Sequence, residues 1–165
     1  MLDKIVPKKI KHLIDLIRLD SPIGFLLLMW PCLFALANLP QDNAELTYWY
    51  VYFVIGAFLM RSAGCIINDF VDINLDKNVE RTAERPLTSK KVSITEAIVL
   101  LFVLLFFSFY ILLQFNFYAI VIGLASIPLV LLYPFLKRYT FWLQLGLGLV
   151  FSWGVLIVSI QFTET

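Results

Sequence analysis

Long apolar runs separated by short polar connections dominate this sequence. Five runs stand out, at about residues 23–39, 48–67, 94–115, 117–136 and 142–161. Each comes close to the stretch of about 20 apolar residues that crosses a bilayer as a helix. Ser93 and Glu96, at the start of the third run, fit a helix-initiating capping box. We therefore expect an all-α, polytopic membrane protein with five transmembrane helices.

A shorter pattern precedes the first run. Apolar residues recur there at helical spacing, with lysines around the rest of the helix: Ile10, Leu13, Ile14 and Ile17. This arrangement predicts an amphipathic helix on the membrane surface. Residues 35–37 also resemble a signal-peptidase site, but Pro31 and the long charged segment before the run argue against cleavage.

Composition supports the membrane assignment. The chain of 165 residues is 61% hydrophobic and 15% charged, against about 45–50% and 25% in soluble domains. A net charge of +1 leaves no basic excess to hold phosphates, so a nucleic-acid partner is excluded. Cys32 and Cys65 lie in apolar runs and are typical of small buried hydrophobes rather than of a redox or zinc pair.

The basic residues predict how the chain crosses the membrane. Except for Arg61, every Lys and Arg falls in the N-terminal segment, in the connection after the second run or in the turn after the fourth run. The alternate connections carry none. By the positive-inside rule, the N-terminus and the basic connections are cytoplasmic.

Arg61 is exceptional because it lies inside the second run. It precedes Asn68 by seven residues, which returns a helix to within about 20° of the same face. Intramembrane arginines usually line a cavity, which favours a functional role. The alternative is a side chain that snorkels to the interface or pairs with a carboxylate for structural reasons.

Polar side chains gather where the second run ends: Asn68, Asp69, Asp72 and Asp76. On a helix they share one face over an arc of about 100°, and three carboxylates so close repel one another unless a cation lies among them. Mg²⁺ with diphosphate oxygens suits such a site, although a solvated polar face explains the spacing equally well. A calcium loop is excluded because Lys77 and Ala83 stand where its glycine and its final glutamate are needed.

Two further sets of side chains follow this acidic cluster. Arg81 and Arg85, four residues apart, predict a clamp for an oxyanion. They lie in a connection of about 24 residues, a length typical of functional loops. Tyr133 and Lys137 begin the next basic turn, where such residues are usually ordinary membrane-interface anchors.

Together these segments resemble the UbiA family of membrane prenyltransferases. The first aspartate-rich motif of that family is matched by Asn68-Asp69-x-x-Asp72-x-x-x-Asp76, followed by Arg81-Thr82 and Arg85-Pro86-Leu87. Other matching segments are Arg18-x-Asp20-Ser21-Pro22-Ile23-Gly24, Leu28-x-Trp30-Pro31, Met60-Arg61-x-x-Gly64-Cys65 and Tyr133-Pro134-Phe135-x-Lys137-Arg138-Tyr139-Thr140. They favour the branch that prenylates 4-hydroxybenzoate in ubiquinone synthesis.

The resemblance implies substrates, a cofactor and residue roles. The residues that would hold Mg²⁺ are Asn68, Asp72 and Asp76, which together with Lys137 form the implied catalytic set. The residues that would bind the diphosphate of a polyprenyl diphosphate are Arg81, Arg85, Lys137 and Tyr133. The residues that would bind the carboxylate of 4-hydroxybenzoate are Arg61 and, more weakly, Arg18. The implied location is the bacterial or mitochondrial inner membrane, in contact with membrane lipid.

The acidic residues that follow Asp76 form no second motif of this kind; they are Glu80, Glu84, Glu96 and Glu164. We therefore expect residues 1–165 to be the N-terminal part of one transmembrane prenyltransferase domain, whose C-terminal half is absent or supplied by a separate chain. Three other readings stay open. They are a non-catalytic membrane piece, another aromatic prenyltransferase of the family, and a small transporter that uses Arg61 and the acidic cluster along its path.

Overall fold

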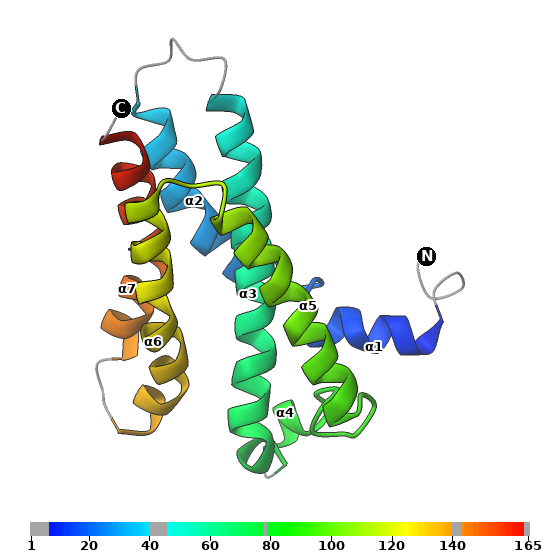
Figure 1. The fold of residues 1–165 in the computed structure, drawn as a ribbon. Helices are drawn as coiled ribbons and strands as arrows, with labels where there is room; N and C mark the ends of the chain where they lie inside the picture. Colours follow the sequence, from blue (N-terminus) through cyan, green and yellow to red (C-terminus); the bar gives the residue numbers. More distant parts are fainter. Residues whose placement is uncertain (1–6, 40–45, 78, 140–142, 164–165) are drawn as a thin grey trace.

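The computed structural model describes residues 7–39, 46–77, 79–139 and 143–163. The side chains of Leu75, Arg81, residues 134–139 and Leu143 lie outside that description. The described residues form seven helices and no strand (Figure 1): α1 (Lys8–Leu16), α2 (Ile23–Ala37), α3 (Leu46–Asp76), α4 (Glu80–Ala83), α5 (Ile94–Leu112), α6 (Phe117–Tyr139) and α7 (Leu143–Thr163). The all-α prediction is confirmed.

Three of the described helices contain segments long and apolar enough to cross a membrane: Leu46–Asn74, Ile94–Leu112 and Gln144–Thr163. Two shorter apolar segments accompany them, Ile23–Ala37 and Phe117–Tyr133. The 15 residues of α2 rise only about 22 Å, which is short of the roughly 30 Å hydrocarbon core. A membrane protein is therefore confirmed, whereas five full spans are not.

The second predicted run is the N-terminal part of a much longer helix. α3 has 31 residues, about 46 Å of helix against a bilayer core of roughly 30 Å. No proline interrupts it, and the apolar stretch passes directly into the polar stretch that holds Asn68, Asp72 and Asp76. The acidic cluster is thus carried on a rigid continuation of a membrane helix.

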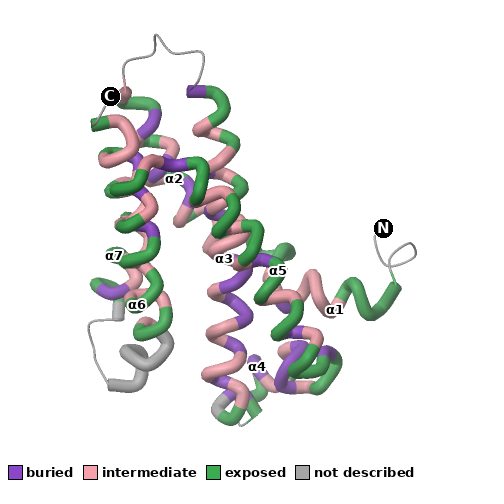
Figure 2. The backbone as a smooth tube through the Cα atoms, in the orientation of Figure 1, coloured by how far each residue is buried: buried purple, intermediate pink, exposed green. Residues whose placement is uncertain are grey.

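The helices form two groups that meet along α3 (Figure 1). α2, α6 and α7 pack together, α5 lies against the other side of α3, and α1 projects sideways from the bundle. Figure 2 shows that buried positions recur along α3, whereas α5 keeps much of its surface exposed. The exposed side chains of α5 include Phe102 and Phe106, as expected for a helix that faces lipid.

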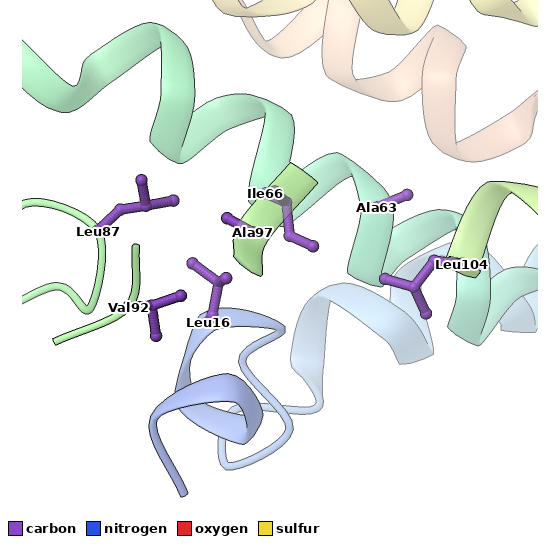
Figure 3. Packing of buried hydrophobic residues seen from close by; sticks show 7 residues of the cluster. All are labelled: Leu16, Ala63, Ile66, Leu87, Val92, Ala97 and Leu104. Carbon is purple, nitrogen blue, oxygen red and sulfur yellow. The ribbon is translucent and has the colours of Figure 1, made fainter. Parts of the chain in front are cut away.

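Two separate groups of buried residues hold the bundle. The α1-side cluster, drawn in Figure 3, consists of Leu16, Ala63, Ile66, Leu87, Val92, Ala97 and Leu104. The α7-side cluster consists of Cys32, Leu36, Phe53, Phe115, Ala119 and Val158. Each cluster joins elements far apart in the sequence, and the two lie toward opposite ends of α3.

Two further sequence predictions concern α1 and the start of α5. α1 is helical, as predicted, and fully buried Leu16 packs it against α3 and α5. The Lys9 ammonium also pairs with Glu96 of α5. The predicted capping box is confirmed, because Ser93 Oγ accepts a hydrogen bond from the Glu96 amide and the Glu96 carboxylate accepts one from the Ser93 amide.

Candidate functional site

A cavity of about 860 Å³ lies between α2, α3, α5, α6 and α7. The residues that α3 contributes to its wall change along the helix, from Phe53 and Ala57 to Arg61, Asn68 and Asp72. The polar residues in the wall are Arg18, Ser21, Tyr52, Arg61, Asn68, Asp72, Arg85, Ser108, Ser126 and Tyr133, of which the charged ones are Arg18, Arg61, Asp72 and Arg85. The aromatic residues toward the other end include Phe53, Phe109, Phe115, Phe151 and Trp153. The cavity therefore has a charged end and an apolar end, as a binding site for an amphiphilic ligand needs.

Arg61 reaches this cavity from the middle of α3, as the sequence predicted for an intramembrane arginine. Its guanidinium lies against the backbone of α2 at Gly24, where a Cβ atom would overlap it. Glycine leaves room for the guanidinium there, despite its cost in a helix, and a Cβ would displace that group. The contact positions a fork of charge-assisted donors at the wall of the cavity.

The acidic cluster is divided between two faces of α3. Asn68 and Asp72, one helical turn apart, line the cavity. Asp69 and Asp76, two turns apart, are not among the lining residues and are 2% and 7% exposed. The expectation that all four share one face is too coarse, because an arc of about 100° is wide enough to face two different neighbours.

The carboxylates of Asp69 and Asp76 form ion pairs with arginines. Asp69 Oδ1 accepts hydrogen bonds from Arg18 Nη2 at 2.8 Å and from Arg85 Nη1 at 3.3 Å, and Asp76 Oδ2 accepts one from Arg85 Nη1 at 2.6 Å. These four residues form an ion-pair network, which we call the arginine–aspartate network. It ties the connection before α2 and the loop after α4 to the end of α3.

The loop after α3 is held by further local bonds. Thr82 Oγ1 donates to the carbonyl oxygens of Asp76 (3.2 Å) and Val79 (3.3 Å), which closes the C-terminal end of α3. At the surface, Lys91 Nζ donates to Glu84 Oε2 at 2.6 Å. This hydrogen bond and the charge of the ammonium lower the pKa of the exposed Glu84 carboxyl.

The charged end offers two oxygen atoms that fit a divalent metal. Asn68 Oδ1 is buried and has no hydrogen-bond partner in the described part of the chain. It shares the cavity wall with the carboxylate of Asp72. One amide oxygen and one carboxylate fit Mg²⁺, which takes few protein ligands and completes its shell with water and phosphate oxygens. Among the described residues, no three His, Cys, Asp or Glu side chains come together as a metal site.

Of the other predicted site residues, some line the cavity and some have side chains outside the described part of the chain. Arg18, Arg85 and Tyr133 line the cavity with Arg61. The side chains of Arg81 and Lys137 lie outside the described residues. The metal-ligand role of Asp76 stays a prediction, since its carboxylate bonds Arg85 here.

Two residues of this region have contacts that were not predicted from the sequence, since Gly24 was given no role and Asp69 was predicted only as a member of the acidic cluster. The sequence could have indicated the contact at Gly24, because a glycine inside an apolar helix costs stability and often marks a close neighbour. No sequence pattern predicts the partners of Asp69, because the two arginines that it bonds lie 51 and 16 residues away in the chain.

The chain is thus a helical membrane protein whose cavity joins a charged end to an apolar end. It belongs to the UbiA prenyltransferase family, whose sequence pattern matches residues 28–165. This confirms the family resemblance that the aspartate-rich motif indicated.

Curated relatives share close to half of their aligned residues with this chain. The 4-hydroxybenzoate octaprenyltransferase of Vibrio campbellii is 49% identical over 148 residues, which cover 90% of this chain and 52% of that protein. The mitochondrial 4-hydroxybenzoate polyprenyltransferases of Caenorhabditis elegans and Rattus norvegicus are 47% and 44% identical, over 92% of this chain and 43% and 41% of theirs. The chain therefore spans about half the length of the curated relatives it matches. No solved structure matches it.

Proposed function

We propose that this chain forms the N-terminal part of a membrane enzyme that transfers a polyprenyl group from polyprenyl diphosphate to the ring of 4-hydroxybenzoate in ubiquinone synthesis. The observation that carries the proposal is the cavity, in which Arg61, Asn68 and Asp72 stand at one end and aromatic side chains at the other. The names of the relatives support the two substrates. Both substrates are anions with an apolar part, which suits a cavity of this kind.

The charged end is the proposed diphosphate site. Asn68 Oδ1 and the carboxylate of Asp72 would hold Mg²⁺, with Asp76 as the third ligand that the family motif implies. When bound, the metal neutralises charge on the diphosphate oxygens. The groups proposed to bind the remaining charge are Arg85 and Tyr133 in the cavity wall, together with Arg81 and Lys137.

Arg61 is the proposed partner of the carboxylate of 4-hydroxybenzoate. A guanidinium pairs with a carboxylate through two parallel hydrogen bonds, and the contact with Gly24 holds the Arg61 fork beside the cavity. Arg18, also in the cavity wall, would contribute at the rim of this subsite. The bidentate pair orients the ring, so that the carbon next to the hydroxyl faces the donor.

The proposed reaction needs charge stabilisation and the exclusion of water. The allylic C–O bond of the donor breaks, and its electron pair leaves with the diphosphate, which Arg85 and the other cations stabilise. The ring carbon next to the hydroxyl forms the new C–C bond and then loses its proton to the released diphosphate. Aromatic faces in the cavity wall can stabilise the allylic cation, while the apolar end takes up the prenyl tail.

The proposed location is the bacterial or mitochondrial inner membrane, with the N-terminus and the basic loops on the cytoplasmic or matrix side. Segments rich in Lys and Arg, such as the connection from Lys77 to Lys91, support this orientation.

The experiment supplies the second half of the domain. Membranes containing this chain, alone or with the C-terminal half of the Vibrio campbellii relative as a separate polypeptide, are incubated with Mg²⁺, a polyprenyl diphosphate and labelled 4-hydroxybenzoate. We expect labelled prenyl product with both halves, and its loss in Asp72→Asn. Unchanged turnover in Asp72→Asn contradicts the assigned site. Absence of product with both halves, while the intact relative is active, favours a non-catalytic membrane piece.

A further inference from the structure

Asp69 is the member of the acidic cluster without a role in the proposed reaction. Its side chain is 2% exposed and is not part of the cavity wall. One of its oxygens, Oδ1, accepts hydrogen bonds from two arginines that do line the cavity, Arg18 and Arg85. We infer that Asp69 is a positioning residue, which holds Arg18 and Arg85 as a pair at the charged end of the cavity to receive substrate anions. The binding role rests on the proposed function.

The geometry leaves both arginines able to bind a ligand. A guanidinium has five N–H donors in a fixed fork. In the described part of the chain, Arg18 bonds Asp69 through Nη2, and Arg85 bonds Asp69 and Asp76 through Nη1. The other donors of each fork make no side-chain bond there, and the two side chains remain 34% and 25% exposed. Asp69 therefore directs the Arg18 guanidinium, and together with Asp76 it directs that of Arg85, while the other N–H donors of both stay available to a ligand.

Apolar packing brings the three partners together. Leu16, Ile66 and Leu87 of the α1-side cluster are two or three residues away from Arg18, Asp69 and Arg85 in the chain, and Figure 3 shows these side chains converging from different elements. All three are at most 3% exposed. The backbone around each charged residue is thus fixed by burial, and the ion pairs need to direct only the side chains.

The end of α1 fixes the backbone at Arg18. Its φ is 56°, in the left-handed region that residues with a side chain rarely adopt. The turn that produces it follows α1 directly, with hydrogen bonds from Arg18 N to Asp15 O and from Leu19 N to Ile14 O. These two hydrogen bonds are those of a Schellman motif, a common end of an α-helix, in which Arg18 takes the left-handed position. Here the turn directs the Arg18 side chain to Asp69.

The first test measures the positions of the arginines without any substrate. The full chain in lipid nanodiscs is treated with phenylglyoxal, and the modification rate of each arginine is followed by mass spectrometry. We expect Asp69→Asn to raise the rates at Arg18 and Arg85 several-fold and to leave Arg61 unchanged. The matched control is Glu84→Gln, which breaks the surface pair with Lys91 and should leave all three rates as they are. Unchanged rates at Arg18 and Arg85 in Asp69→Asn overturn the inference.

The second test measures binding of farnesyl thiolodiphosphate, a slowly ionising donor analogue, to the same samples with Mg²⁺ present. We expect about a tenfold loss of affinity in Asp69→Asn, the size expected for weakened charge-assisted hydrogen bonds. In Arg85→Gln the added Asp69→Asn change should have a smaller effect, because only Arg18 is then left for Asp69 to position and residues that act through each other are not additive. Wild-type affinity in Asp69→Asn, or effects that multiply fully with Arg85→Gln, overturn the inference.

Two variants keep the outcome interpretable. Asp69→Glu retains the charge but moves the carboxylate, so modification rates between those of the wild type and Asp69→Asn are expected. If Asp69→Asn does not fold, this variant carries the test, and wild-type rates in it count against the inference. If the wild-type chain binds no analogue even with the C-terminal half of the Vibrio campbellii relative present, the proposed function fails, and the phenylglyoxal rates still decide whether Asp69 positions the two arginines.

Discussion

The two ends of the cavity are held in shape by different interactions. At the charged end, the arginine–aspartate network joins segments that the α1-side cluster packs together. At the apolar end, aromatic edges meet within the α7-side cluster, as in the contact of Phe53 with Phe115 at 5.2 Å between ring centroids. A few hydrogen bonds add to it, such as Asn116 N to Gln161 Oε1 at 2.8 Å. Both ends use the same helix, α3.

The difference follows from the surroundings of each end. Lipid is as apolar as the side chains between helices, so burial there gives little net stabilisation, and shape and hydrogen bonds must select the packing. Near the membrane boundary the unfolded chain is in contact with water. Burial of apolar side chains there therefore gives the full hydrophobic stabilisation of a soluble protein. The charged end can therefore support buried carboxylates and arginines, which are costly to hold unless they are paired.

The largest expected effect compares two leucines that are both 0% exposed, Leu16 in the α1-side cluster and Leu36 in the α7-side cluster. Leu16→Ala should cost about 2–5 kcal/mol of stability, the usual range for a buried leucine. Leu36→Ala should cost less, because lipid is its alternative environment. Reversible unfolding in mixed micelles measures both, and an equal or larger cost for Leu36→Ala contradicts the comparison.

Asp72→Ala should weaken binding of farnesyl thiolodiphosphate about a hundredfold, since it removes the carboxylate proposed to hold the metal. Asp72 is 7% exposed and has interactions of its own, so circular dichroism of Asp72→Ala is needed to separate loss of the metal ligand from loss of the fold. The control is Glu80→Gln, at an exposed carboxylate of α4. Mg²⁺-dependent binding is measured by equilibrium dialysis, and a loss equal in both variants would show only a general charge effect.

Gly24→Ala should weaken binding of 4-hydroxybenzoate about tenfold, because the added Cβ displaces the Arg61 guanidinium from its place on α2. Diphosphate binding should change much less. Gly148→Ala is the matched control, since nothing lies within 4 Å of a Cβ built there. Saturation binding of labelled 4-hydroxybenzoate distinguishes the two, and equal affinities in both variants reject the proposed role of Arg61.

The smallest expected effect concerns the start of α5. Ser93→Ala removes the side-chain half of the capping box and should cost about 1 kcal/mol. Because Glu96 also pairs with Lys9 of α1, the loss should appear first as faster amide exchange in the first turn of α5 and in α1. Faster exchange spread evenly over all helices would indicate global destabilisation instead.

Much of the fold was predictable because it depends on local patterns. The apolar runs, the amphipathic helix before them and the Ser93–Glu96 capping box each require only residues close in sequence. Membership of the family was equally readable from the spacing of Asn68, Asp72 and Asp76. The predicted number of five spans is not confirmed, because the 15 residues of α2 are too few to cross a bilayer.

The candidate site was predictable as a set of polar residues, but not as an arrangement. Helical periodicity places Asn68, Asp69, Asp72 and Asp76 on one broad arc, and it cannot say which neighbour each part of that arc meets. The approach of Arg18 to Asp69 across 51 residues, and that of Arg61 to Gly24, depend on how α1 and α2 pack against α3.

The sequence by itself determined that the chain lies in a membrane, where its helices form and which chemical groups are available. Apolar length, helix caps and charge are properties of short segments. Only the tertiary structure decided which groups face the cavity. It turned Asn68 and Asp72 toward the open volume and placed Arg85 between Asp69 and Asp76. The physical reason is that ion pairs and close backbone contacts act over a few ångströms between segments distant in the chain, so packing alone can assemble them.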